Sequence, residues 1–250
     1  MSRRKQSAAS GQKSAKTVGS ALSARGSMLG AFTLLELLVV AGLVAVLSFV
    51  FVGGLGGGGK AAALQSAQAT LMNLITAART KAMASGRSAR ILVHVDVLSA
   101  SEPRRYLRYL AIQIQTDTGW QTAADPFLPE GIYIVPGNFA AVPSGLFAAG
   151  PVPWTRNDGS ALCSTALRSN QITTETINGT VAEQWVGIVF SAQGGTMQSG
   201  DIVLAPGKVR PPGSYSPGES PAELDQPENV RGLTLSSYGV PALVNGRRGF

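Results

Sequence analysis

The clearest chemical feature of this sequence is one acidic residue inside a long apolar stretch. Residues 32–52 are FTLLELLVVAGLVAVLSFVFV, 21 residues in which Glu36 is the one charged side chain. A helix of this length rises roughly 31 Å, close to the hydrocarbon thickness of a bilayer. A carboxylate inside such a helix costs about 2.5 to 3.5 kcal/mol on insertion scales. We therefore expect a transmembrane helix in which Glu36 is paired with a positive charge at a similar depth.

The strongest sign of catalysis in the sequence is a match to the phosphate-binding loop motif, but the match is incomplete. Residues 54–60 fit G-x-x-x-x-G-K after an apolar run. A P-loop continues with Ser or Thr, whose hydroxyl reaches magnesium, whereas the next residue here is Ala61. The preceding apolar run is also far longer than a strand. We interpret residues 53–59, of which six are glycine, as a break or flexible point of the helix at the membrane exit.

His94 and Cys163 are each the single residue of their type in the chain. One histidine without a second ligand or a nucleophile at suitable spacing makes neither a metal site nor a catalytic triad. We expect His94 to be an ordinary residue on the polar face of a strand. Cys163 cannot close an intramolecular disulfide, and we expect a small residue in an irregular segment, with an intermolecular bridge or another thiol role as the alternative. The sequence thus predicts no enzyme, no metal site and no cofactor.

The positive charge of the chain is concentrated at its beginning. The formal net charge is +7, and residues 1–31 hold six basic residues and no acidic one, which leaves 15 basic against 14 acidic residues beyond them. Residues 1–31 are also rich in Ser, Ala and Gly, a composition typical of a processing segment and not of a folded domain. We therefore predict a basic leader that stays in the cytoplasm, followed by a segment that crosses the membrane outward. The remaining charge balance gives no support to nucleic-acid binding.

The elements that follow the apolar run predict an α+β head, residues 60–250. From residue 60 to residue 86 apolar side chains recur at spacings of three and four, as in an amphipathic helix, and Gly86 fits its C-terminal stop. Beyond that point the apolar period changes to two, as in strands. Long irregular loops are expected at 136–180 and 206–229. The predicted strands are 91–97, 110–114, 132–135, 185–190, 201–205 and 232–236.

Residues 31–40 have the sequence Ala31-Phe32-Thr33-Leu34-Leu35-Glu36 followed by LLVV. This segment closely resembles the cleavage signal of type IV pilins and pseudopilins. The resemblance implies that a prepilin peptidase cuts between Ala31 and Phe32 and methylates the new N-terminus. It also implies that Glu36, at the fifth mature position, pairs during filament assembly with the α-amine of a neighbouring subunit, with Thr33 in the same assembly segment. The family nearly always has glycine before the cut, so cleavage after Gly30 is the alternative.

The resemblance weakens beyond residue 52 but continues into the head. Residues 77–97 are similar to the helix end and first strand of H-type minor pseudopilins of type II secretion. Trp120, the pair Leu128-Pro129 and residues 190–195 also fit that family. The expected fold is accordingly pilin-like, with a long N-terminal helix packed on an antiparallel β-sheet. The loops at 136–180 and 206–229 have no counterpart.

These observations predict a structural subunit, either a minor pilin or a pseudopilin, in a type IV pilus or a type II secretion-like filament. The expected location is the inner membrane, with a cytoplasmic N-terminus and a periplasmic head. The expected partners are prepilin peptidase, other pilin or pseudopilin subunits, the inner-membrane assembly platform and the lipid bilayer. A major pilin and a tip-displayed binding module for DNA or a secreted substrate are the alternatives.

A binding role would depend on one segment in which basic and aromatic residues are interleaved. Its residues are Arg104, Arg105 and Arg108, beside Tyr106 and Tyr109. Basic side chains interleaved with aromatic ones can contact an anionic partner or DNA. We favour the simpler interpretation that they form a solvated hairpin edge.

Overall fold

The computed structural model describes residues 34–98, 102–137, 142–168, 172–179 and 181–250, with side chains in the first range described at 37–44 and from 59 onward. The chain divides into two compact units, Met1–Phe49 and Val50–Phe250. All strands belong to the second unit. Ala31, Phe32 and Thr33, where the cleavage signal is predicted, lie outside the described residues, and so does the side chain of Glu36.

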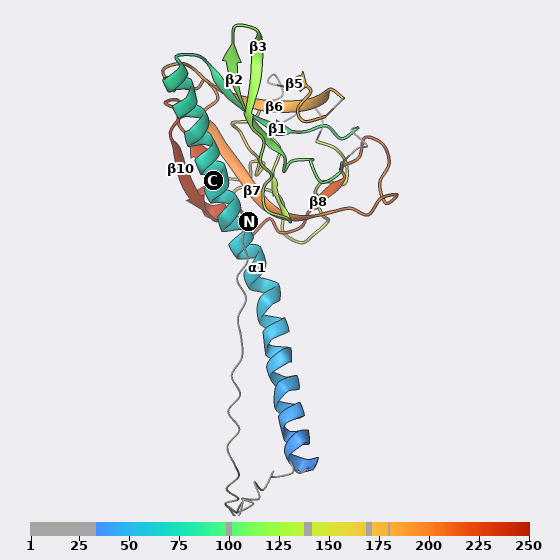
Figure 1. Cartoon of the computed structure of the whole chain (residues 1–250). Helices are drawn as coiled ribbons and strands as arrows, with labels where there is room; N and C mark the ends of the chain where they lie inside the picture. The colour runs from blue at the N-terminus through green and yellow to red at the C-terminus, as the bar shows by residue number, and fades with distance from the viewer. Residues whose placement is uncertain (1–33, 99–101, 138–141, 169–171, 180) are drawn as a thin grey trace, which may run out of the picture. The chain divides into compact units, whose positions relative to one another are not determined.

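Helix α1 extends over Leu34–Ser85 (Figure 1). It continues through residues 53–59, so the predicted break of the helix at the glycines is wrong, while the alternative of a flexible point stays a prediction. Glycine lowers the stability of a helix without removing its backbone hydrogen bonds, which explains why the ladder can persist there. At the other end, Gly86 follows the last helical residue with φ of +63°, a left-handed conformation that glycine adopts without strain. The predicted stop at Gly86 is confirmed.

Ten strands form two antiparallel sheets, each of five strands, in the second unit. The first sheet has the order β3-β2-β1-β6-β5, and the second has the order β10-β9-β7-β4, with β8 paired to β7. The strands of the first sheet are β1 (Ala89–His94), β2 (Leu110–Thr116), β3 (Gly119–Ala124), β5 (Ile172–Glu175) and β6 (Glu183–Phe190). Those of the second are β4 (Ile132–Ile134), β7 (Gly200–Val209), β8 (Ala222–Leu224), β9 (Arg231–Leu235) and β10 (Pro241–Asn245), followed by the short 3₁₀-helix η2 (Arg247–Gly249).

The predicted α+β class is confirmed, and each of the six predicted strands has a counterpart. Strands β3, β5, β8 and β10 were not predicted from the sequence. Strand β3 has the sequence GWQTAA and β5 has ITTE, and neither shows the regular alternation of aliphatic residues by which a strand is recognised. Strand β8 has three residues, too few to show a period.

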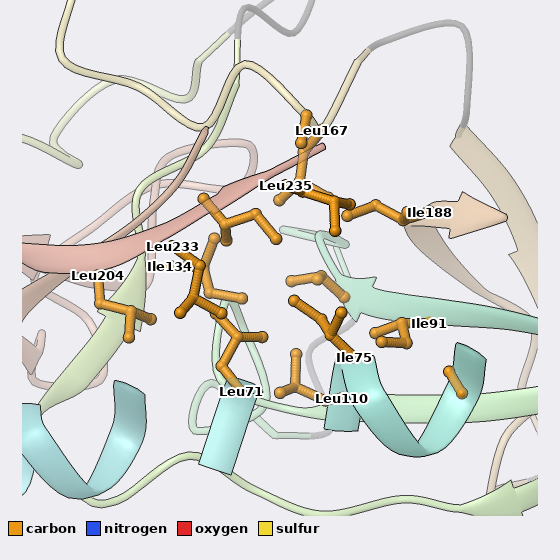
Figure 2. Packing of buried hydrophobic residues seen from close by; sticks show 14 of the residues in the cluster. Leu71, Ile75, Ile91, Leu110, Ile134, Leu167, Ile188, Leu204, Leu233 and Leu235 are labelled. Carbon is orange, nitrogen blue, oxygen red and sulfur yellow. The ribbon is translucent and has the colours of Figure 1, made fainter. Parts of the chain in front are cut away.

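One apolar core fills the space between α1 and both sheets. Leu71 and Ile75 of the helix point into it, toward side chains from β1, β4 and β9 (Figure 2). Gln68 is the polar exception on this helix face, because its amide donates hydrogen bonds to the carbonyl oxygens of Gly232, 2.8 Å away, and Val244, 3.0 Å away. The helical residues buried in this core are Leu64, Ala67, Leu71, Ile75, Ala78 and Ala82.

The sheets are also covered on the faces that point away from α1. A second core packs Tyr133 of β4 and Val203 of β7 against Leu146 and Leu162, which come from the segment expected to be an irregular loop at 136–180. The expected loop at 206–229 contributes the rest of β7, all of β8 and the buried residues Ala222 and Leu224. The prediction of irregular segments is confirmed for residues 142–168, which form no helix or strand, and is wrong where β5, the end of β7 and β8 form strands. The buried residues of both segments pack as a layer over the sheets.

Candidate functional site

The first sheet carries a polar cluster on the face opposite α1. Along β1, Ile91 and Val93 enter the core under the helix, whereas Leu92 packs in a separate cluster with Tyr109 and Trp185. His94 pairs with Trp185 across β1 and β6. Side chains of successive strand residues alternate between the two faces, which places Arg90, Leu92 and His94 together on the outer one.

His94 is buried, and the expectation of an ordinary polar-face residue is wrong. Its side chain is 1% exposed and meets the Trp185 ring edge-on, with centroids 5.1 Å apart. Nε2 lies 3.5 Å from Oε1 of Glu183, longer than a good hydrogen bond. Burial lowers the pKa of His94, and the negative charge of Glu183 only partly opposes that shift. The imidazole is consequently neutral at neutral pH.

Glu183 forms an ion pair with Arg105, an arginine that was predicted to lie in solvent. Nη1 of Arg105 lies 2.8 Å from Oε2 of Glu183, and Nη2 donates a hydrogen bond to the carbonyl oxygen of Ile177 at 3.0 Å. The guanidinium also stacks over the ring of Tyr109, 4.3 Å from its centroid. A tight turn places Arg105 here, because its own amide bonds to the Glu102 carbonyl oxygen and its carbonyl oxygen accepts from the Tyr109 amide.

A cavity of about 470 Å³ opens beside this ion pair. On its wall the hydroxyl of Tyr109 donates to Asp125 at 2.8 Å, and the side-chain amide of Asn178 donates to the same carboxylate. Phe127 stacks on Tyr109 with centroids 4.5 Å apart and stays 46% exposed. Burial raises the pKa of Tyr109, so the phenol keeps its proton and acts as a donor.

A second cavity, of about 600 Å³, shares Glu102 and Phe127 with the first. Its remaining lining residues are Pro103, Arg104, Arg108 and Glu130. Arg108 is 7% exposed and donates from Nη2 to the Leu128 carbonyl oxygen at 3.1 Å. The predicted solvated hairpin edge is thus wrong for Arg105, Arg108, Tyr106 and Tyr109, which are all buried, and fits only Arg104, which is exposed.

A third cavity, of about 580 Å³, lies in the layer over the second sheet and includes the cysteine. Phe147 and Trp154 pack there with centroids 4.9 Å apart, and Cys163 is half-buried without a disulfide partner among the residues described. Burial raises the pKa of the Cys163 thiol, which makes it a poor nucleophile at neutral pH.

The other features singled out in the sequence do not meet at one place. Lys60, the last residue of the P-loop-like motif, is in helix α1 and lies 3.5 Å from Asp225, so its ammonium group faces a carboxylate. Within the described ranges, no three His, Cys, Asp or Glu side chains gather where they would hold a metal ion. In the same ranges no helix is both long and apolar enough to cross a bilayer.

The buried polar cluster was missed because it has no local signature. Arg90, His94, Arg105, Arg108 and Glu183 are dispersed over three segments of the chain. The one available signal was the turn at 102–109, where three arginines alternate with aromatic and apolar residues. That density of aromatic neighbours is unusual for a solvated edge and favours packing of the guanidinium groups on rings.

Comparison with solved structures finds distant similarity to two kinds of protein. For the type IV minor pilin FimU of Pseudomonas aeruginosa the identity is 13% and the TM-score 0.33, over 72% of this chain and 87% of that one. For the minor pseudopilin EpsH of the type II secretion system of Vibrio cholerae, two structures give identities of 17% and 16% and TM-scores of 0.33 and 0.34. They cover 73% and 74% of this chain and 95% and 94% of EpsH. No family model and no curated protein matches.

Proposed function

We propose that this chain is a minor pilin or pseudopilin, a structural subunit of a filament of the type IV pilus or type II secretion kind. The observation that carries the proposal is the order of three features at the start of the sequence. A basic leader, the segment 31–40 with Glu36 at its centre, and an apolar run of bilayer length follow one another without interruption. The α+β head, in which an amphipathic helix packs on antiparallel sheets, suits a subunit whose helix continues into that apolar run.

The proposed location is the inner membrane, with residues 1–31 on the cytoplasmic side and the head in the periplasm. The first described side chains of α1 support this location, because they are aliphatic and more than half exposed. Such side chains need lipid or the apolar helices of neighbouring subunits around them. They are Leu37, Leu38, Val39, Val40, Leu43 and Val44.

In this proposal the chain performs no catalysis and its partners act on it or assemble with it. Prepilin peptidase cuts before Phe32 and methylates the exposed amine. The new amine then pairs with Glu36 of a neighbouring subunit, which offsets the cost of two charges in a medium of low dielectric constant. The assembly platform of the inner membrane adds the subunit to the filament.

The first test is the mass of the mature chain, isolated from membranes of the native host. We expect it to begin at Phe32 with one methyl group on its amine. The mass itself distinguishes the two possible cuts, because cleavage after Gly30 leaves Ala31 on the mature chain and cleavage after Ala31 removes it. Retention of Met1, or a cut beyond Val52, would refute the proposal.

The second test separates processing from assembly. Replacing Glu36 with Leu removes a charge that is costly in the bilayer, so insertion and cleavage should be retained. Incorporation into sheared or crosslinked filaments should fall sharply, because the neighbour's amine loses its partner. Equal incorporation of the processed variant and the wild type would show that Glu36 has no role in assembly.

A further inference from the structure

Arg108 stands apart from the other buried arginines of the head. Three arginine side chains are buried in the described residues, namely Arg90, Arg105 and Arg108. Arg90 forms an ion pair with Glu175, and Arg105 forms one with Glu183. Among the residues that the structure describes, no carboxylate lies within ion-pair distance of Arg108.

The guanidinium of Arg108 is also incompletely hydrogen-bonded. Nη2 donates to the Leu128 carbonyl oxygen, and the guanidinium also hydrogen-bonds the hydroxyl of Tyr133, whose ring centroid lies 5.5 Å from the central carbon. Nε is buried and meets no acceptor in the described part of the chain. A largely buried cation without a paired anion is costly, because burial removes much of its hydration and no carboxylate compensates for the loss. This position therefore favours the arrival of a negatively charged group.

The cavity beside Arg108 has room for such a group and for part of the molecule that carries it. Its volume is about 600 Å³, far more than one carboxylate fills. Pro103 and the half-exposed ring of Phe127 line it with apolar surface. Because Phe127 and Glu102 also line the 470 Å³ cavity, the two cavities form one continuous surface across the ring.

The charges around the cavity decide which anion fits. Arg104 and Arg108 are balanced by Glu102 and Glu130, so the four charged lining residues sum to zero. A polyanion such as nucleic acid gains no net attraction from this arrangement and meets two carboxylates. A single carboxylate can reach Arg108 while the rest of its carrier lies on Phe127, and a guanidinium matches a carboxylate in a two-bond fork.

We propose that this cavity binds a peptide segment of a partner protein through one carboxylate, with Arg108 as its anchor and Phe127 as the platform for the neighbouring peptide atoms. The proposal depends on the head alone and is independent of how the chain is cleaved or anchored.

The test uses the full chain, purified in a mild detergent and labelled with ¹⁵N at arginine. The Nε–H resonance of Arg108 is followed during titration with four probes at constant ionic strength. They are sodium chloride, sodium acetate, an acetylated and amidated Ala-Gly pentapeptide with one central Glu, and the same peptide with Gln. We expect the Glu peptide to shift the resonance at the lowest concentration, acetate to shift it at a higher one, and the Gln peptide and chloride to leave it unchanged.

Three variants locate the binding. Arg108→Lys keeps the charge but loses the fork, and should weaken binding of the Glu peptide about tenfold. Phe127→Ala removes a half-exposed ring and should weaken binding of the peptide but not of acetate. Arg248→Gln, at an exposed arginine that lines neither cavity, is the matched control and should change the affinity by no more than about twofold.

The outcomes separate the alternatives. If neither carboxylate probe shifts the Arg108 resonance, or if chloride shifts it equally, the site does not exist. Equal affinity for acetate and the Glu peptide would overturn the peptide part of the proposal. Binding of a DNA duplex that displaces the Glu peptide would overturn the choice of a single carboxylate. The Gln peptide and Phe127→Ala keep the test decisive even if the Arg108 variant fails to fold.

Discussion

The two faces of strand β1 are stabilised by different forces although they belong to the same six residues. Ala89, Ile91 and Val93 belong to the apolar core beneath α1. Arg90 and His94 point the other way and are also buried, 8% and 1% exposed, beside Glu175 and Glu183. Burial is nearly complete on both faces, so exposure alone does not distinguish them.

The difference is in what a substitution leaves behind. On the helix face the side chains have no polar groups, and a smaller residue leaves a cavity whose cost depends on how far its walls can relax. On the outer face the buried arginine side chain is stabilised by an ion pair with a particular carboxylate. A substitution there leaves the partner buried and uncompensated, which cannot be relieved by repacking. We therefore expect the outer face to be the less tolerant one.

The largest effect is expected for Glu183→Gln. The variant keeps the size of the side chain and removes the charge opposite Arg105, so the free energy of unfolding should fall by about 3 to 5 kcal/mol. Denaturation with urea, followed by tryptophan fluorescence to which buried Trp185 contributes, measures it. The matched control is the double variant Arg105→Met with Glu183→Leu, which should lie much closer to the wild type. A loss below about 1 kcal/mol for Glu183→Gln would remove the proposed distinction between the faces.

The helix face should respond next most strongly, at Leu71. This side chain is 1% exposed and points into the core between the sheets (Figure 2). Leu71→Ala should lower the free energy of unfolding by about 3 kcal/mol, through lost apolar contact and the cavity that remains. Asn73→Ala, two residues along and exposed, should stay within about 0.5 kcal/mol of the wild type. Similar losses for the two variants would mean that α1 is not held by this stripe.

The sequence predicts the helix face better than the outer face, and the reason is the range of the interactions. The stripe that includes Leu64, Leu71 and Ile75 is visible in one segment because helical geometry sets its spacing. Alternation along β1 likewise identifies Ile91 and Val93 as core residues. The same alternation assigns the intervening residues to solvent, which is correct only when nothing covers that face.

What covers the outer face comes from segments without a regular period. Tyr109 packs against Trp185 with ring centroids 5.4 Å apart, and Ile177 belongs to the same cluster. Tyr109 comes from the turn before β2 and Ile177 from the segment between β5 and β6, and no spacing rule links them. The pairing of Arg105 with Glu183 joins residues 78 positions apart. Of the candidate site, the arginine-aromatic turn could be noticed in the sequence, but its burial could not.

The pH dependence of stability should reveal the burial of His94. Glu183, Arg105 and Asp96 are the charged groups that act on it, and burial is the strongest influence, so the pKa of the folded state is below the ordinary 6.5. The unfolded chain then takes up a proton near pH 6.5 that the folded chain does not. Stability is therefore full above pH 6.5 and falls as the pH drops toward the folded pKa, by at most about 1.4 kcal/mol per pH unit.

Urea denaturation at several values between pH 7 and pH 5 measures this slope. The chain has one histidine, so no other imidazole titrates in the same window. His94→Phe keeps a ring of similar shape against Trp185 and should flatten the slope, whatever its stability at pH 7. An unchanged slope in the variant would show that the dependence arises from carboxylates and that His94 is not held neutral.

The smallest effect is expected at the edge of the outer face, where a buried hydroxyl meets a cavity. The phenol of Tyr109 keeps its proton because burial raises its pKa, and it donates to Asp125 at 2.8 Å. Tyr109→Phe removes that hydrogen bond but keeps the ring that stacks on Phe127 and under Arg105. Asp125 still accepts from Asn178, so no charge is left without a donor and the free energy of unfolding should fall by only about 1 kcal/mol.

Tyr238→Phe, at a ring that is 77% exposed, is the control and should be neutral. A loss at Tyr109 as large as the loss at Glu183 would show that the whole outer face acts as one hydrogen-bonded network, so that its intolerance would not depend on the buried ion pair alone.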